Sequence, residues 1–261
     1  MSCDVSYEAS GPATAPVLVL AGSLGTDRSM WDPQVAPLAS RFRVVRYDLR
    51  GHGESPVPPA PYSIADLGED LLALLDRLEI ERASLCGLSI GGMTSMWVAA
   101  RAPARVERMV LCSTTAWFGS AASAAYAERA AIVRERGLEE LADSIVARWF
   151  TPKFREAERD VVARMRRILV ATAPEGYAGC CEAIAAMDLR PELSSISAPT
   201  LVVAAEDDPA TPPQHGRAVA EGIAGADFTV VPSAAHLASV ERAELVTTLL
   251  LRFLHPEEES R

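Results

Sequence analysis

The sequence predicts an α/β fold, in which a mainly parallel sheet is flanked by helices and one helical segment is inserted. Two observations carry this prediction. Short apolar runs of strand type alternate with helical patterns along most of the 261 residues, which is typical of parallel strands joined by crossover helices. The alternation stops between residues 121 and 186, where the pattern is helical throughout. We therefore predict a core of residues 1–120 and 187–261, with residues 121–186 as a helical lid over the carboxyl edge of the sheet.

Six short apolar runs are expected to form the strands. They are residues 17–20, 44–47, 83–86, 109–112, 200–205 and 228–231. The clearest helix is 63–79, where Ser63 and Asp66 match a capping box. Leucine and isoleucine residues at helical spacing give this helix one apolar face, made of Ile64, Leu67, Leu71, Leu74, Leu75 and Leu78. A second helix, 91–102, is rich in small residues.

The most informative motif is Gly-Leu-Ser-Ile-Gly at residues 87–91, where strand 83–86 must turn into helix 91–102. A Gly-x-Ser-x-Gly pattern between a strand and a helix is typical of a nucleophile elbow, a tight turn that holds the serine hydroxyl in an exposed position. The glycines let the strand and the helix approach each other without a side-chain clash. We therefore predict that Ser89 is a nucleophile; the alternative is a structural turn whose serine only caps the helix.

A serine nucleophile needs a histidine as its base, and a carboxylate that orients the histidine. In this motif type the chain order is serine, acid, histidine. Glu206, Asp207 and Asp208 follow strand 200–205, and His236 follows the last strand, so the order is met. Adjacent side chains of an extended segment point in opposite directions, so Asp207 and Asp208 cannot both face the histidine. We favour Asp208 and keep Asp207 as the alternative.

The other three histidines are His52, His215 and His255. His52 lies in a turn after strand 44–47, where a structural hydrogen-bonding role is expected. His215 lies early in a helix that opens at two prolines, and His255 lies in the polar C-terminal tail, so both are expected to be solvated surface residues. His236 therefore has the best context for the base.

Acyl transfer also needs donors that stabilise the oxyanion of the tetrahedral intermediate. In this motif type one donor is the backbone N–H that follows the nucleophile, here that of Ile90, and the other comes from a loop after an earlier strand. The Gly-rich loop 21–25 follows strand 17–20. We assign the second donor to Ser23, with Leu24 as the alternative.

Composition narrows the class of protein. A hydrophobic content of 49% with 23% charged residues is typical of a globular domain. The net charge of −10 argues against nucleic acid and anionic membrane surfaces as partners. No apolar run approaches the ~20 residues that span a bilayer, and no signal peptide is apparent. The five cysteines are expected to be reduced thiols in the cytoplasm, and no Cys/His cluster has metal-ligand spacing, so we expect neither a metal nor a cofactor.

Within the predicted lid, Arg148-Trp149-Phe150 differs from the surrounding charged residues, most of which are expected to form a solvated face. Two aromatic side chains beside an arginine offer both an apolar wall and a clamp for an anion. The alternative is that the aromatic residues are lid core and the arginine is a surface residue. The sequence pattern by itself favours the second interpretation.

The elbow, the loop 22–27, the run 30–34 and the segment 47–55 together resemble the α/β-hydrolase superfamily. The acid loop 208–213 narrows the resemblance. Together with residues 177–184 and 187–190, it is similar to 3-oxoadipate enol-lactonases. The resemblance covers nearly the whole chain; one departure is the Ala-Gly pair at 21–22, where a more polar pair is expected.

That resemblance implies Ser89, Asp208 and His236 as a catalytic triad, and it supports Arg148 and Trp149 as pocket residues. It also implies a serine hydrolase that opens 3-oxoadipate enol-lactone with water to 3-oxoadipate, in the β-ketoadipate pathway of aromatic catabolism. An acidic protein that binds an anionic lactone needs local positive charge in its pocket, which favours Arg148. The alternatives are a general carboxylesterase, a cofactor-free perhydrolase on the same fold, and a lactone-binding receptor without turnover.

Overall fold

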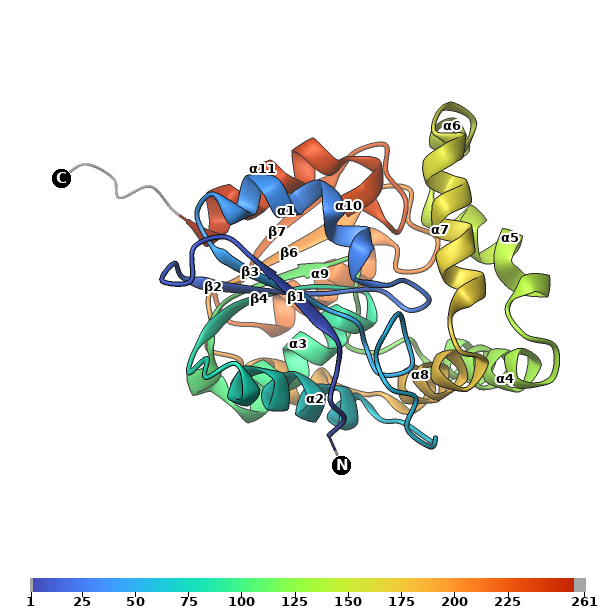
Figure 1. Cartoon of the computed structure of the whole chain (residues 1–261), viewed down its shortest axis with the longest axis horizontal. Helices are drawn as coiled ribbons and strands as arrows, with labels where there is room; N and C mark the ends of the chain where they lie inside the picture. Colours follow the sequence, from blue (N-terminus) through green and yellow to red (C-terminus); the bar gives the residue numbers. More distant parts are fainter. Residues whose placement is uncertain (1, 256–261) are drawn as a thin grey trace.

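A computed structural model describes residues 2–255 of the chain (Figure 1). Within these residues, seven strands form one sheet in the order β1-β3-β2-β4-β5-β6-β7. The strands are β1 (Tyr7–Ser10), β2 (Val17–Ala21), β3 (Arg43–Tyr47), β4 (Ala83–Leu88), β5 (Val106–Cys112), β6 (Thr200–Ala205) and β7 (Asp227–Val231). Every neighbouring pair is parallel except β1 with β3, which is antiparallel. The mainly parallel sheet predicted from the sequence is confirmed.

Helices cover both faces of this sheet (Figure 1). Those of the core are α1 (Asp32–Ala39), α2 (Ile64–Arg77), α3 (Ile90–Arg101), α9 (Pro213–Gly222), α10 (Ala238–Glu241) and α11 (Ala243–Leu254), with short 3-10 turns at Arg28–Trp31, Pro103–Arg105 and Arg190–Ser195. Helices α1 and α11 lie together on one face, and α2 and α3 lie together on the other (Figure 1). The sheet is therefore the middle layer of three.

The predicted strands and the predicted helices of the core are all present. They form because of interactions between residues close together in the chain. Ser63 caps α2 as a capping box: its hydroxyl accepts from the Asp66 N–H at 3.2 Å, and the Asp66 carboxylate accepts from the Ser63 N–H at 2.9 Å. The sequence did not predict β1. Its residues are mostly exposed, so they lack the apolar pattern of a strand, and only the antiparallel pairing with β3 identifies it.

Between β5 and β6 the chain forms helices that lie as a block beside the sheet (Figure 1). The block comprises α4 (Ser120–Arg136), α5 (Glu139–Trp149), α6 (Pro152–Ala157), α7 (Arg159–Ala171) and α8 (Pro174–Ala186). Helix α4 packs along α8, and α5 packs against α7. No helix in residues 2–255 is both long enough and apolar enough to cross a membrane.

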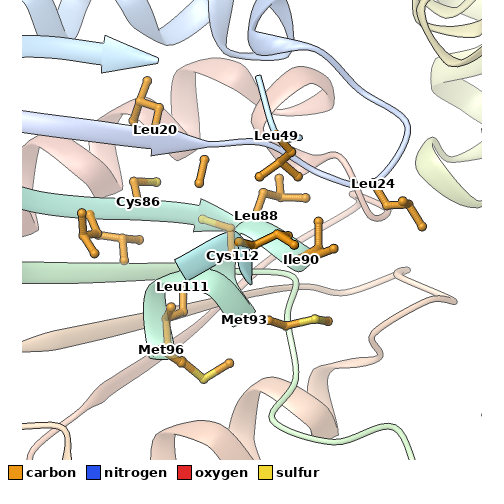
Figure 2. Packing of buried hydrophobic residues seen from close by; sticks show 14 of the residues in the cluster. Leu20, Leu24, Leu49, Cys86, Leu88, Ile90, Met93, Met96, Leu111 and Cys112 are labelled. Carbon is orange, nitrogen blue, oxygen red and sulfur yellow. The ribbon is translucent and has the colours of Figure 1, made fainter. Parts of the chain in front are cut away.

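Buried apolar side chains support the junction of β4 and α3. Figure 2 shows them converging from β2, β4, β5 and α3; those of Leu20, Cys86, Leu88, Ile90, Met93, Met96, Leu111 and Cys112 are each at most 4% exposed. All five cysteines lie in the described part of the chain and are free thiols. Buried apolar side chains therefore pack around the turn between β4 and α3.

Candidate active site

Ser89 occupies the turn between β4 and α3 with φ 57° and ψ −117°, a backbone conformation that a serine rarely adopts. Neighbouring groups hold it there. Its N–H donates to the Cys112 carbonyl at 2.9 Å, and its carbonyl accepts from the Thr114 hydroxyl at 2.7 Å and from the Met93 N–H at 3.1 Å. Such strain persists only where the surroundings over-determine it, and it is frequent at reactive sites.

The glycines on either side of Ser89 are required by contact. A Cβ atom on Gly87 would overlap the Gly91 carbonyl, and one on Gly91 would overlap the Ala21 carbonyl of β2. The Gly91 N–H also donates to the Gly22 carbonyl at 3.1 Å. These contacts seat the start of α3 directly against the loop after β2.

His236 and Asp208 are joined by a buried hydrogen bond. The distance from His236 Nδ1 to Asp208 Oδ2 is 2.8 Å, and the two residues are 5% and 3% exposed. Asp208 also accepts from the Thr211 hydroxyl at 2.7 Å, from the Thr211 N–H at 3.0 Å and from the Ala210 N–H at 2.8 Å. Burial opposes ionisation of Asp208, but His236 and these donors lower its pKa to about 2. Asp208 is therefore a carboxylate at neutral pH.

The two acidic residues before Asp208 form no hydrogen bond with His236. Asp207 is exposed, and its backbone N–H donates to the Ala234 carbonyl at 2.9 Å. Glu206 accepts from the Ser233 N–H at 2.8 Å. The geometry thus pairs the favoured carboxylate, Asp208, with His236.

His52 has the structural role expected of it. It is 1% exposed, its Nε2 accepts from the Gly25 N–H at 3.0 Å, and its Nδ1 lies 3.1 Å from the Arg50 carbonyl. Because Nε2 accepts, the proton is on Nδ1 and donates to that carbonyl. Burial lowers the pKa of His52 to about 4, so the neutral ring supports the loop that contains Gly25.

The surface prediction for His215 was wrong, whereas His255 is exposed as predicted. His215 is half-buried, with Nδ1 2.9 Å from the Thr115 hydroxyl and its ring centroid 5.8 Å from that of Phe118. The segment after β5 covers it, and a contact of that kind is not visible in the local pattern of α9. Burial lowers the pKa of His215.

The loop after β2 bears on the choice between Ser23 and Leu24 as an oxyanion donor. The Ser23 N–H already donates within its own turn, to the Thr26 hydroxyl at 3.1 Å and the Met30 sulfur at 3.3 Å. The N–H groups of Leu24 and Ile90 have no acceptor among residues 2–255. This geometry speaks against Ser23, our first assignment, and favours the alternative, Leu24.

One pocket collects these residues and has an empty volume of about 360 Å³. From the core it is lined by Ser23, Leu24, Ser89, Ala210 and His236. From the helical block it is lined by Tyr126, Arg129, Ile145, Arg148, Trp149 and Tyr177. Asp208 lies behind His236, and the expected pair Arg148 and Trp149 do line the pocket. Phe150 does not; it is buried and stacks on Phe154 with ring centroids 5.1 Å apart.

Sequence reasoning missed five of the lining residues, Tyr126, Arg129, Ile145, Tyr177 and Ala210. Arg129 is one of the charged lid residues, most of which the sequence pattern assigns to a solvated face. One signal was available: Tyr126 and Arg129 are three residues apart, and that spacing places them on the same side of a helix.

Backbone contacts tie the helical block to the loop that carries His236. The Leu237 N–H donates to the Trp149 carbonyl at 3.0 Å. The Glu241 carboxylate accepts from the Ala235 N–H at 2.9 Å and from the Thr151 N–H at 3.2 Å. The residues before and after His236 are therefore both held, directly or through Glu241, to the end of α5.

A family model described as the alpha/beta hydrolase fold matches residues 16–243. The chain belongs to the alpha/beta hydrolase family. This confirms the superfamily and the fold class that the sequence motifs predict.

Within this family, the chain is similar to proteins named enol-lactonases. It is 41% identical, over 240 residues, to a protein of Acinetobacter baylyi named 3-oxoadipate enol-lactonase 2, with 92% of this chain and 89% of the relative covered. It is 39% identical to 3-oxoadipate enol-lactonase 1 of the same organism, covering 92% and 89%. The crystal structure of the enol-lactonase of Burkholderia xenovorans is similar with a TM-score of 0.93 and 46% identity, over 96% of both chains.

Proposed function

We propose that this hydrolase opens 3-oxoadipate enol-lactone with water to give 3-oxoadipate, in the β-ketoadipate pathway of aromatic catabolism. The observation that carries the proposal is one pocket lined by Ser89, by His236 and by the cationic side chain of Arg148. The similarity to enol-lactonases over most of the chain supports the same substrate. Its five free thiols favour the cytoplasm as the place of reaction.

In the first half of the reaction, Ser89 Oγ attacks the lactone carbonyl and His236 takes the hydroxyl proton at Nε2. The Asp208 carboxylate on Nδ1 holds the ring in the required tautomer and stabilises the imidazolium that forms. The N–H groups of Leu24 and Ile90 stabilise the oxyanion. The ring C–O bond then breaks, and the enol oxygen that leaves takes its proton from His236.

The enol remains tethered to the acyl-enzyme and tautomerises to a ketone, which draws acylation forward. In the second half, His236 removes a proton from water as the water attacks the acyl carbon. The ester bond to Ser89 breaks, and Ser89 recovers its proton from His236. The product leaves with two carboxylates. The substrate carries one of them throughout, so a protein of net charge −10 needs a local cation such as Arg148 to bind it.

The test follows the ultraviolet absorbance of freshly generated 3-oxoadipate enol-lactone with the wild type and with Ser89→Ala. Removing the nucleophile of a triad is expected to lower kcat by about 10⁶-fold. The matched control is Ser95→Ala, six residues further along the chain in α3. The Ser95 hydroxyl donates only to the Gly91 carbonyl, at 2.8 Å, so its loss is expected to leave kcat within about threefold.

Rapid lactone turnover by Ser89→Ala would exclude Ser89 as the nucleophile. A wild type that hydrolyses p-nitrophenyl acetate but leaves the lactone intact would reject the substrate and keep the hydrolase chemistry. Thermal unfolding of all three proteins checks that each is folded.

A further inference from the structure

Two arginines of the pocket wall, Arg129 on α4 and Arg148 on α5, pair with no carboxylate within residues 2–255. Other arginines of the same helical block do pair with carboxylates. Arg134 pairs with Glu175 at 2.9 Å, and Arg166 holds two carboxylates at 2.7 Å each. The chain has 35 acidic and 25 basic residues, so carboxylates are in excess. Two arginines that line a pocket and have no carboxylate partner there indicate an anionic ligand.

Arg129 is held in position by aromatic side chains. Its guanidinium carbon lies 5.0 Å from the centroid of the Tyr126 ring, and the guanidinium group lies beside the Tyr177 hydroxyl. Tyr177 is itself 1% exposed. A guanidinium group already held in place loses little conformational freedom when it binds a carboxylate, and its planar fork matches two carboxylate oxygens.

We propose that Arg129 binds the substrate carboxylate together with Arg148, and that the pocket thereby selects acyl compounds with a carboxylate at the end remote from the reacting carbonyl. For the lactone this rests on the proposed function. The selection also extends to monoesters of short dicarboxylic acids. There, Ser89 attacks the ester carbonyl, the alcohol leaves with a proton from His236, and water then releases the acid from Ser89.

The same arrangement makes dicarboxylates inhibitors. One carboxylate of such a ligand lies at the two arginines, and the other lies where the oxyanion forms, near the N–H groups of Leu24 and Ile90. Because both arginines line the same pocket as Ser89, a short chain is enough to join the two ends of such a ligand. Adipate, a six-carbon dicarboxylate, is the probe, and adipamide is its uncharged counterpart.

The experiment measures inhibition by adipate and by adipamide of p-nitrophenyl acetate hydrolysis, in the wild type, Arg129→Met, Arg148→Met and Arg136→Met. Adipate is expected to inhibit the wild type competitively, at least about tenfold more strongly than adipamide. Arg129→Met and Arg148→Met are each expected to raise the adipate inhibition constant about 10- to 100-fold, well beyond any fall in kcat/KM for the neutral ester. Arg136→Met, the matched control on α4, leaves both unchanged, because Arg136 is exposed and pairs with Glu140.

An adipate inhibition constant that is unchanged in Arg129→Met, or that rises only in step with a loss of neutral-ester activity, would make Arg129 structural and overturn the proposal. If Arg129→Met does not fold, Arg129→Lys replaces it: a cation without the planar fork is expected to weaken adipate about 3- to 10-fold. Equal adipate inhibition of Arg129→Lys and the wild type would overturn the proposal in that case.

Lactone turnover, measured in parallel, separates this inference from the proposed function. Arg129-dependent adipate inhibition in a protein that does not open the lactone would reject the function and keep the carboxylate site. Lactone turnover with a KM that is unchanged in Arg129→Met would keep the function and reject the second arginine.

Discussion

At the scale of single residues, the environment of one carboxylate separates it from its neighbour in the chain. Asp208 points inward and accepts hydrogen bonds from His236 and from the turn at Ala210 and Thr211, whereas Asp207 is exposed to solvent. Two adjacent aspartates therefore differ in burial and in hydrogen bonding. Only a buried carboxylate in contact with the ring can fix the histidine tautomer.

We predict that Asp208→Asn lowers kcat by about 10⁴-fold, because an amide keeps the shape of the side chain but not the charge that stabilises the imidazolium. The matched control is Asp207→Asn, expected to leave kcat within about threefold. Steady-state kinetics on p-nitrophenyl acetate measures both without depending on the lactone. A loss confined to Asp207→Asn would show that the alternative carboxylate is the functional one.

At the scale of elements, two glycines seat the first turn of α8 against the core. A Cβ atom on Gly176 would overlap the carbonyl of Gly51, and one on Gly51 would overlap the Gly176 backbone. Gly51 precedes His52, whose ring accepts from the Gly25 N–H of the loop after β2. Direct backbone contact thus relates a helix that carries the pocket residue Tyr177 to the loop whose Ser23 and Leu24 line the same pocket.

Gly176→Ala distinguishes this contact from helix propensity. Propensity alone predicts that alanine inside α8 stabilises the protein by about 1 kcal/mol. The contact predicts the opposite: destabilisation by about 1–3 kcal/mol, with a higher KM as α8 moves away from the pocket. Urea denaturation and steady-state kinetics measure the two effects.

The matched control for Gly176→Ala is Gly137→Ala. Gly137 follows α4 with φ 74° and has no atom within 4 Å of an added Cβ, so its substitution costs only backbone strain, about 1–3 kcal/mol, without a change in KM. A Gly176→Ala protein more stable than the wild type would mean that the contact with Gly51 relaxes without cost.

At the scale of the whole molecule, the buried neutral His52 makes stability depend on pH. Its pKa is about 4 when folded, against an ordinary value of 6.5, so the unfolded chain binds more protons between these values. Stability therefore falls as the pH decreases from 6.5 to 4. Asp208 affects stability in a more acidic range. Its pKa of about 2 lies below the ordinary 3.8, so its contribution to the free energy of unfolding is lost only as the pH falls below about 4.

We predict that His52→Gln is less stable than the wild type at pH 7 and that the gap narrows by up to about 3 kcal/mol between pH 7 and pH 4. The difference between the two proteins isolates His52 from other titrating groups, including His215. Urea denaturation at several pH values provides the free energies of unfolding. Parallel curves for the two proteins would show that His52 does not titrate in this range.

The sequence by itself determined the parallel sheet, the elbow at Ser89 and the chain order of serine, acid and histidine. These depend on neighbours in the chain: apolar runs of strand length, the capping box at Ser63 and the glycines around the serine act over a few residues. Such local patterns do not depend on tertiary contacts, so they can be recognised in the sequence.

Only the tertiary structure decided which loop N–H is free, because the Thr26 hydroxyl occupies the Ser23 donor. It also decided that β1 is a strand, that His215 is half-buried and that Arg129 faces a pocket instead of solvent. Each depends on groups brought together by packing: a partner strand, a covering loop, or two helices around a cavity. A charged residue on a helix has the same local pattern in water or in a pocket, and only the packing of α4 against α8 separates the two.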